Sequence, residues 1–171
     1  MNAPCPTLPY TDLAGVACEI SACSFARSGG PWGVTRVANV MTPFPYAVGA
    51  HESIHTARAM MRQHGIRHLP VMRDGELVGI ASARELDVAI ELLTERDPQV
   101  ELPVWAVCRR DPYTVELDTS IADVADALAS QQIGSVLVTR HGKLAGIVTT
   151  VDICRAYAEL LRKEPPPDEP A

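Results

Sequence analysis

The chain has 171 residues, of which 47% are apolar and 21% charged, and its formal net charge is -6. These values are typical of one compact domain or of two small repeats that share a core, and they argue against wholesale disorder. The negative charge makes nucleic acid an unexpected partner, although a few Arg and His side chains can still hold one phosphate group, and no apolar stretch is long enough to predict a membrane span.

Residues 1–36 mix Pro, Cys, Gly and Ser without sustained periodicity, so we expect an irregular N-terminal segment. Its start lacks the basic and apolar regions of a secretory signal peptide, which predicts a cytoplasmic protein. The five cysteines are an odd count, so we expect reduced thiols and no disulfide framework. Cys18 and Cys23 invite a metal or redox interpretation, but their spacing is poor for zinc and no His or second cysteine pair lies nearby.

A sequence repeat covers most of the remaining chain. Sliding the sequence by 67 residues superposes 41–86 on 108–153 without a gap, and 12 of the 46 aligned positions are identical. This agreement is far above chance for unrelated segments. We therefore expect two copies of one structural unit, in residues 37–98 and 99–163.

The first copy begins with a predicted helix. Apolar residues at Ile54, Ala57 and Met61 recur with a helical period, and Ser53 stands where an N-cap belongs. Two apolar runs, 68–72 and 77–81, then flank an Arg-Asp-Gly sequence and predict two strands joined by a tight turn. A second helix, rich in Ala, Leu, Glu and Arg, is predicted from about residue 82 to residue 95.

The second copy repeats this order, with strands predicted at 135–139 and 144–148 and a last helix at 149–163. The result is an α/β fold of the α+β type, in which each copy has a small sheet flanked by two helices. One copy has too few residues to cover both, so we expect the copies to pair about a pseudo-two-fold axis. Residues 164–171 are Pro-rich and acidic and are predicted to be a disordered tail.

In each copy, a residue with a hydroxyl side chain follows the second strand, and an acidic residue stands three positions later. These pairs are Ser82 with Glu85 and Thr149 with Asp152. This spacing is typical of a capping box, in which the two side chains satisfy free N–H groups of a helix. A second interpretation is a ligand site. A helix N-terminus with a hydroxyl can hold a phosphate, and two carboxylate oxygens can accept both protons of a ribose cis-diol. Taken alone, the spacing favours the capping interpretation, and the ligand site depends on what surrounds the motif.

Taken together, these motifs resemble the tandem pair of the cystathionine β-synthase (CBS) domain family. The resemblance covers about residues 37–161 and depends on the lead-in Val40–Pro43, the segment Gly65–Val71, the turn Arg73–Gly75 and the two strand-to-helix endings. As a set spaced twice along one chain these pieces are specific for the family, although each alone is weak. What the resemblance implies is two clefts between the copies, each able to take AMP, ADP, ATP or a related adenosyl compound.

The resemblance also implies a role for each part of the motif. Adenine is expected against the backbone near 66–68 or 133–135, ribose at the acid, and phosphate at the hydroxyl and nearby basic side chains. The candidate ligand-binding residues are Val40, Ile66, Arg67, His68, Ser82, Glu85, Ile133, Gly134, Ser135, Thr149, Thr150 and Asp152.

The two clefts are not expected to be equal. Glu85 is one methylene longer than the Asp that the family usually has, and the second copy lacks a counterpart of the basic pair Arg67 and His68. We therefore expect one principal site at Thr149 and Asp152, with the basic pair reaching across to it or serving the other cleft.

These features predict a regulatory protein that binds an adenine nucleotide, forms a homodimer and signals by association with a protein partner. We expect neither an enzyme nor a required cofactor or metal, because no His has the motif context of a nucleophilic site. Two alternatives stay open. One is a ligand-free CBS scaffold, suggested by Glu85, and the other is a thiol-dependent redox or metal protein that uses Cys18 and Cys23.

Four residues outside the motifs also carry expectations. Cys108 and Cys154 are predicted to be small apolar core residues. Arg73 and Arg140 flank the two predicted turns and are expected at the surface.

Overall fold

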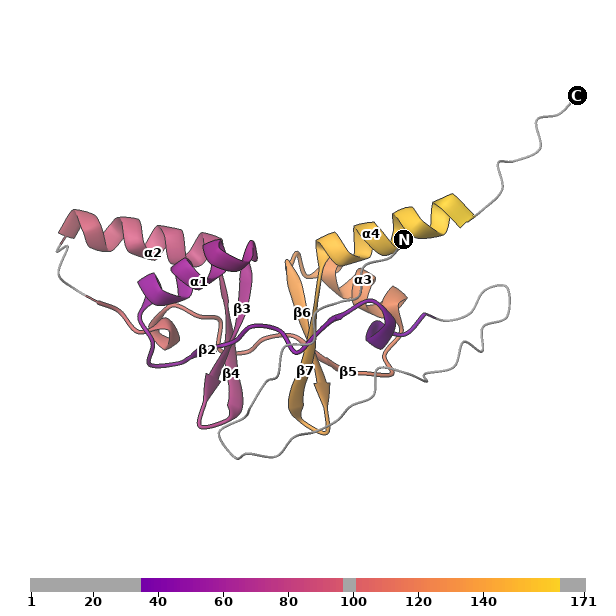
Figure 1. Ribbon diagram of the computed structural model, residues 1–171, viewed down its shortest axis with the longest axis horizontal. Coiled ribbons are helices and arrows are strands. Elements are labelled where there is room, and N and C mark those ends of the chain that lie inside the picture. Colours follow the sequence, from indigo (N-terminus) through magenta and orange to yellow (C-terminus); the bar gives the residue numbers. More distant parts are fainter. Residues whose placement is uncertain (1–34, 97–100, 164–171) are drawn as a thin grey trace, which may run out of the picture. The chain divides into compact units, whose positions relative to one another are not determined.

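The computed structural model describes residues 35–96 and 101–163 (Figure 1). In the first repeat, α1 (Ile54–His64) is followed by β3 (His68–Arg73), β4 (Glu76–Ser82) and α2 (Ala83–Arg96). The second repeat has α3 (Ile121–Ser130), β6 (Ser135–Arg140), β7 (Lys143–Thr149) and α4 (Thr150–Lys163). The predicted α-β-β-α order of both copies is confirmed. The expectations for residues 1–34, for the tail 164–171 and for Cys18 and Cys23 lie outside the described residues.

Each α-β-β-α unit is preceded by a short irregular lead-in. A 3-10 turn (Val37–Asn39), β1 (Thr42–Pro43) and β2 (Val48–Gly49) precede α1. A second 3-10 turn (Val104–Ala106) and β5 (Thr114–Glu116) precede α3. The sequence predicted neither these turns nor the strand pairing of the lead-ins.

Local signals in the sequence account for the ends of these elements. The Ser53 hydroxyl accepts a hydrogen bond from the Thr56 amide at 3.1 Å, so the predicted N-cap of α1 is confirmed. Gly65 ends α1 at φ 64°, a left-handed conformation that glycine adopts without steric cost. Both hairpin turns place two successive residues at positive φ, which matches the right-handed twist of the strands that they join.

The strands form two small sheets. One sheet has the order β2-β3-β4, with β2 parallel to β3 and β3 antiparallel to β4. The other has the order β1-β7-β6-β5 and so contains a strand of the first lead-in. β1 pairs with β7 through Thr42 and Ile147. In the same way, the second lead-in bridges the first sheet between Arg109 and Ile80.

The two repeats therefore exchange the first part of their lead-ins, whereas β2 and β5 pair within their own repeats. Arg36 bridges Ser120, and Ser53 bridges Pro103, which is the same contact shifted by the 67 residues of the sequence repeat. This reciprocity is what the predicted pseudo-two-fold relation requires. The sequence boundary between residues 98 and 99 falls within 97–100, outside the described residues.

Each repeat builds its own hydrophobic core and completes it with the other repeat's lead-in. Val104 and Cys108 are buried in the core of the first repeat, and Val37 is buried in the core of the second. The prediction that Cys108 is a core residue is confirmed. The same prediction for Cys154 is wrong, because this residue lies on an exposed side of α4. Within the described residues, no helix combines the length and apolar character needed to cross a membrane.

Candidate functional site

The Thr149–Asp152 segment joins β7 to α4. The amide of Thr149 donates to Asp152 Oδ2 at 2.9 Å, and the Thr149 hydroxyl donates to the same oxygen at 2.7 Å. The other oxygen, Oδ1, lies 3.6 Å from a guanidinium nitrogen of the exposed Arg155. The capping interpretation is thus confirmed for this joint. One carboxylate oxygen is fully used by the cap, and the other has only a long ionic contact.

The equivalent segment of the first repeat, Ser82–Glu85, joins β4 to α2 and has one more hydrogen bond. We call Ser82–Glu85 the first joint and Thr149–Asp152 the second joint. Glu85 Oε2 accepts from the Ser82 amide at 3.0 Å and from the Ser82 hydroxyl at 2.8 Å. The Glu85 amide in turn donates to the Ser82 hydroxyl at 3.3 Å. Within the described part of the chain, the corresponding bond from the Asp152 amide to the Thr149 hydroxyl is not formed. The longer acid therefore closes a full reciprocal capping box, whereas Asp152 closes only part of one.

The basic pair lies at the first joint and reaches the second repeat. His68 pairs with Ser82 across the sheet, and the Arg67 carbonyl accepts from the amide of Ala83 at 2.8 Å. A Cβ added at Gly134 would lie only 2.8 Å from His68 Nε2, so the imidazole rests against this glycine of the other repeat. Arg67 is exposed.

The surroundings of His68 change its affinity for a proton. Burial lowers the pKa of His68, the positive charge of Arg67 lowers it further, and Glu85 opposes them. His68 is therefore a neutral side chain at pH 7, packed between the repeats. Its hydrogen-bonding capacity remains, but it adds little positive charge to the joint.

The candidate residues that were expected near adenine are held by backbone bonds within their own repeats. The amides of Ile66 and Ile133 donate to Met61 and Leu128 at 2.9 and 3.2 Å. The carbonyl of Gly134 accepts from the amide of Thr150 at 3.3 Å. The first two bonds tie the residues before β3 and β6 to the helix that precedes each hairpin, and the third ties Gly134 to the start of α4.

Two further candidates join this second-repeat joint from different directions. Ser135 pairs with Thr149 across β6 and β7. Val40 is half-buried and lies at the end of the first 3-10 turn, two residues before Thr42, which pairs with Ile147 of β7. The structure thus places Ser135 beside the capping pair and brings the first lead-in, which includes Val40, to strand β7. The ligand-binding role assigned to these residues stays a prediction.

Metal and pocket geometry add two observations. Among the described residues, no group of three or more His, Cys, Asp or Glu side chains is arranged to hold a metal ion. A pocket of about 530 Å³ lies beside the first hairpin and includes neither joint. Sequence reasoning did not identify this pocket, because its residues come from β3, β4 and both lead-ins.

The fold and its joints define the class of the protein, a tandem pair of α-β-β-α domains with exchanged lead-ins and a capped hydroxyl–acid motif in each domain. The family model of the CBS domain matches residues 37–92 and 101–159. The chain belongs to the CBS domain family.

Two curated relatives illustrate the range of proteins that contain this pair. The uncharacterized protein MJ1404 of Methanocaldococcus jannaschii is 32% identical over 139 residues, which are 74% of this chain and 32% of the relative. Hypoxic response protein 1 of Mycobacterium tuberculosis is 30% identical over 127 residues, which are 74% of this chain and 87% of the relative. The chain thus spans about a third of the first relative and most of the second.

Solved structures agree with the fold and include ligand complexes. A putative acetoin utilization protein (AcuB) from Vibrio cholerae has a TM-score of 0.69 at 27% identity, covering 75% of this chain and 96% of its own. The CBS domain pair of protein MJ0100, in complex with 5'-methylthioadenosine and S-adenosyl-L-methionine, has a TM-score of 0.64 at 26% identity, with 72% and 99% covered. CBSX2 in complex with AMP has a TM-score of 0.62 at 25% identity, with 74% and 98% covered.

Proposed function

We propose that this protein is a regulatory module that binds an adenosyl compound, such as AMP, ADP, ATP or S-adenosylmethionine, at the joint formed by Thr149 and Asp152. The observation that carries the proposal is that the Thr149 hydroxyl and the Asp152 carboxylate meet at the start of α4, at the end of the strand that pairs with the first lead-in. Two similar structures contain adenosyl ligands, which supports the same class of ligand here. We propose no catalytic activity, and the cytoplasm stays its predicted location.

Ligand binding at this joint requires Asp152 to change partners. Its Oδ1 atom has only the 3.6 Å contact with Arg155 and can accept one ribose hydroxyl proton with little loss. Its Oδ2 atom accepts two bonds from Thr149, so the second ribose hydroxyl competes with the cap. Rotation of the Thr149 hydroxyl away from Asp152 makes that proton available to a phosphate. The ligand thus exchanges one set of hydrogen bonds for another instead of filling an empty site.

The same reasoning makes the first joint the weaker candidate. Ser82 and Glu85 satisfy each other through three hydrogen bonds, so a ligand has more to displace there. The basic pair nevertheless lies at this joint, and His68 touches Gly134 of the second repeat. We propose that Thr149 and Asp152 form the principal site and that His68 and Arg67 approach its phosphate end from across the repeat boundary.

We further propose that the signal passes through a homodimer. The helices α2 and α4 expose large apolar side chains that a single chain leaves in contact with water. They are Val88, Leu92, Val151, Tyr157, Leu160 and Leu161, each between 47% and 62% exposed. A second copy of the chain is the occupant that the family resemblance implies for such a surface. Each of these helices begins directly at a ligand joint, so a change at the joint reaches the dimer surface.

Calorimetric titration with AMP, ADP, ATP and S-adenosylmethionine tests the proposal. We expect at least one of them to bind, and we expect Asp152→Asn to weaken that binding because the amide no longer accepts two ribose protons. The matched variant Glu85→Gln at the first joint is expected to retain the affinity. Absence of binding by all four compounds, or equal affinity in both variants, contradicts the assignment.

The use of one carboxylate oxygen of each acid in capping favours one alternative, a CBS scaffold that binds no adenosyl ligand. The titration separates the two functions, because the scaffold has no affinity for any of the four compounds. The thiol-dependent redox or metal function would use Cys18 and Cys23, which lie outside the described residues. Metal analysis of the purified protein and thiol titration test it directly.

A further inference from the structure

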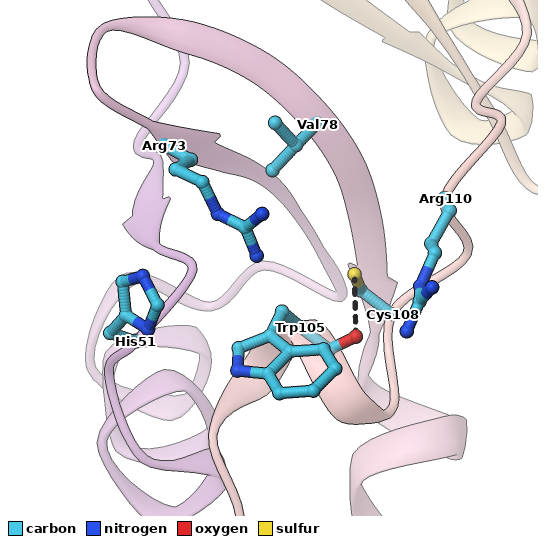
Figure 2. Close-up of a pocket in the computed structure, with 6 residues that line it drawn as sticks. All are labelled: His51, Arg73, Val78, Trp105, Cys108 and Arg110. Carbon is cyan, nitrogen blue, oxygen red and sulfur yellow. Dashed lines mark hydrogen bonds between the residues drawn. The ribbon is translucent and has the colours of Figure 1, made fainter.

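A pocket beside the first hairpin contains an unusual set of side chains (Figure 2). Its volume of about 530 Å³ is in the range of small-molecule sites. The residues that line it are His51, Arg73, Val78, Trp105, Cys108 and Arg110. Arg73 extends from the end of β3 toward Trp105, and the indole lies between His51 and Arg110.

The basic side chains of this pocket have no acidic partners among the described residues. The ion pairs of that part of the chain join Arg58 to Asp87 and Arg155 to Asp152, and neither pair belongs to the pocket. Carboxylates are near in sequence or register. Glu52 follows His51, Glu76 pairs with Arg73 across the hairpin and Asp111 follows Arg110, yet none of them forms an ion pair there. Two guanidinium groups that form no salt bridge with the described carboxylates therefore line this pocket, and they are free to bind an anion.

Apolar surface lies between these cations. Val78 and Trp105 are half-buried, and the Arg110 guanidinium carbon is 5.4 Å from the centre of the indole ring. Cys108 is buried and donates to the Trp105 carbonyl at 3.7 Å. Burial raises the pKa of the Cys108 thiol, so it carries no negative charge at pH 7 that would repel an anion.

The fold does not require this chemistry. The second repeat has the same elements, and the sequence offset of 67 residues gives a counterpart for each lining residue. The counterparts of His51, Trp105 and Arg110 are Asp118, Ala38 and Pro43, while Arg73 is kept as Arg140 and Val78 and Cys108 are replaced by the apolar Ala145 and Met41. The second repeat thus lacks the indole, the imidazole and one of the two guanidinium groups.

We propose that this pocket is a second ligand site, distinct from the nucleotide joint, for a small organic anion with a flat aromatic body. Arg73 and Arg110 hold the anionic group, and Trp105 with Val78 covers the ring. An aryl carboxylate and an aryl phosphate share this chemistry, because guanidinium groups bind both anions through charge-assisted hydrogen bonds. The proposal does not depend on the proposed nucleotide function.

Trp105 fluorescence reports binding directly. The chain has two tryptophans, so in the full-length Trp32→Phe variant the signal comes from Trp105 alone. We titrate this variant with benzoate, phenyl phosphate, the uncharged isostere benzamide and inorganic phosphate. Benzoate or phenyl phosphate is expected to give a saturable change below about 10 mM, and the tighter of the two identifies the anion class. Benzamide and inorganic phosphate are expected to bind at least about tenfold more weakly.

Substitutions then locate the site. Arg73→Gln and Arg110→Gln, each made in the Trp32→Phe protein, are expected to weaken aryl anion binding about tenfold, since each removes a charged hydrogen-bond donor. Arg140→Gln, the same change at the counterpart of Arg73, is expected to leave the affinity unchanged. All three side chains are exposed, so the variants are expected to fold, and circular dichroism verifies this.

Several results overturn the proposal. They are the absence of saturation by both aryl anions, equal binding of benzamide, equal binding of inorganic phosphate, and equal effects of the variants at Arg73 and Arg140. Displacement of benzoate by AMP overturns the existence of a second site. Asp152→Asn is expected to leave benzoate affinity intact, so failure of the nucleotide function and failure of this proposal give different results.

Discussion

Asp152 has two roles in our account, a helix cap in the free protein and a ribose acceptor in the complex, and one substitution measures both. Asp152→Ala removes the acceptor of two hydrogen bonds, at 2.9 and 2.7 Å, from a side chain that is 14% exposed. Loss of a helix cap costs about 1 kcal/mol, and loss of a negative charge at a helix N-terminus costs about 0.5 kcal/mol. We expect the free energy of unfolding to fall by about 1.5 kcal/mol, or about 3–6 °C in Tm for a chain of this size.

The assay is thermal unfolding with and without ligand. Without ligand, the Ala variant is expected to melt lower by this amount, while Asp152→Asn, which keeps one acceptor oxygen, is expected to lose less. With AMP at about 100 times its Kd, the parent is expected to gain about 2.7 kcal/mol. Both variants are expected to gain much less, because their site is impaired.

Two results would refute this reasoning. An Ala variant as stable as the parent without ligand means that the cap does not form in solution. A variant that loses the cap but keeps the full stabilisation by AMP means that the ligand binds elsewhere, and the principal site at Thr149 and Asp152 is then wrong.

Three other predictions concern packing and assembly. The pKa of His68 is lowered in the folded state, so the unfolded state takes up the proton first as the pH falls below about 6.5, and the free energy of unfolding decreases on acidification. His68→Gln is expected to reduce this decrease, which urea titrations at several pH values measure. Gly79→Ala would place a Cβ 2.7 Å from the Arg109 carbonyl oxygen and is expected to lower the free energy of unfolding by about 1–3 kcal/mol. The control Gly49→Ala, on exposed backbone, is expected to lower it less, and equal decreases in denaturant titrations contradict the close approach of the second lead-in to Gly79. Leu92→Glu with Leu160→Glu is expected to convert a dimer to a monomer in sedimentation velocity, and an unchanged dimer contradicts an interface on α2 and α4.

Local sequence signals predicted the elements because each depends on residues close in the chain. The helical spacing of Ile54, Ala57 and Met61, the cap at Ser53 and the turn at Gly75 all act within a few residues. The repeat then extended these predictions to the second copy. β3 and β6 begin where predicted and end one residue later, and β4 and β7 are one residue longer at both ends, because the pairing continues to the edge of each turn and to Ser82 and Thr149 at the open end of each hairpin.

The exchange of the lead-ins could not be predicted in this way. β1 has only two residues, and its partner Ile147 is more than a hundred positions away. Nothing in the composition of 37–43 shows that Val37 fills the core of the other repeat. The error at Cys154 has a related cause, since the apolar character of a small thiol does not reveal which side of α4 faces the core.

The candidate joints show where a motif is informative and where it is not. The spacing of Thr149 and Asp152 taken alone favours a cap, and the structure shows Asp152 Oδ2 in that role; a ligand bound there, as we propose, competes for the same oxygen. A ligand that takes over Asp152 releases the start of α4, and α4 carries part of the exposed apolar surface. The first joint, with its complete capping box, offers no comparable exchange. We infer that the one-methylene difference between Glu85 and Asp152 makes the second joint responsive to ligand and keeps the first as a fixed support.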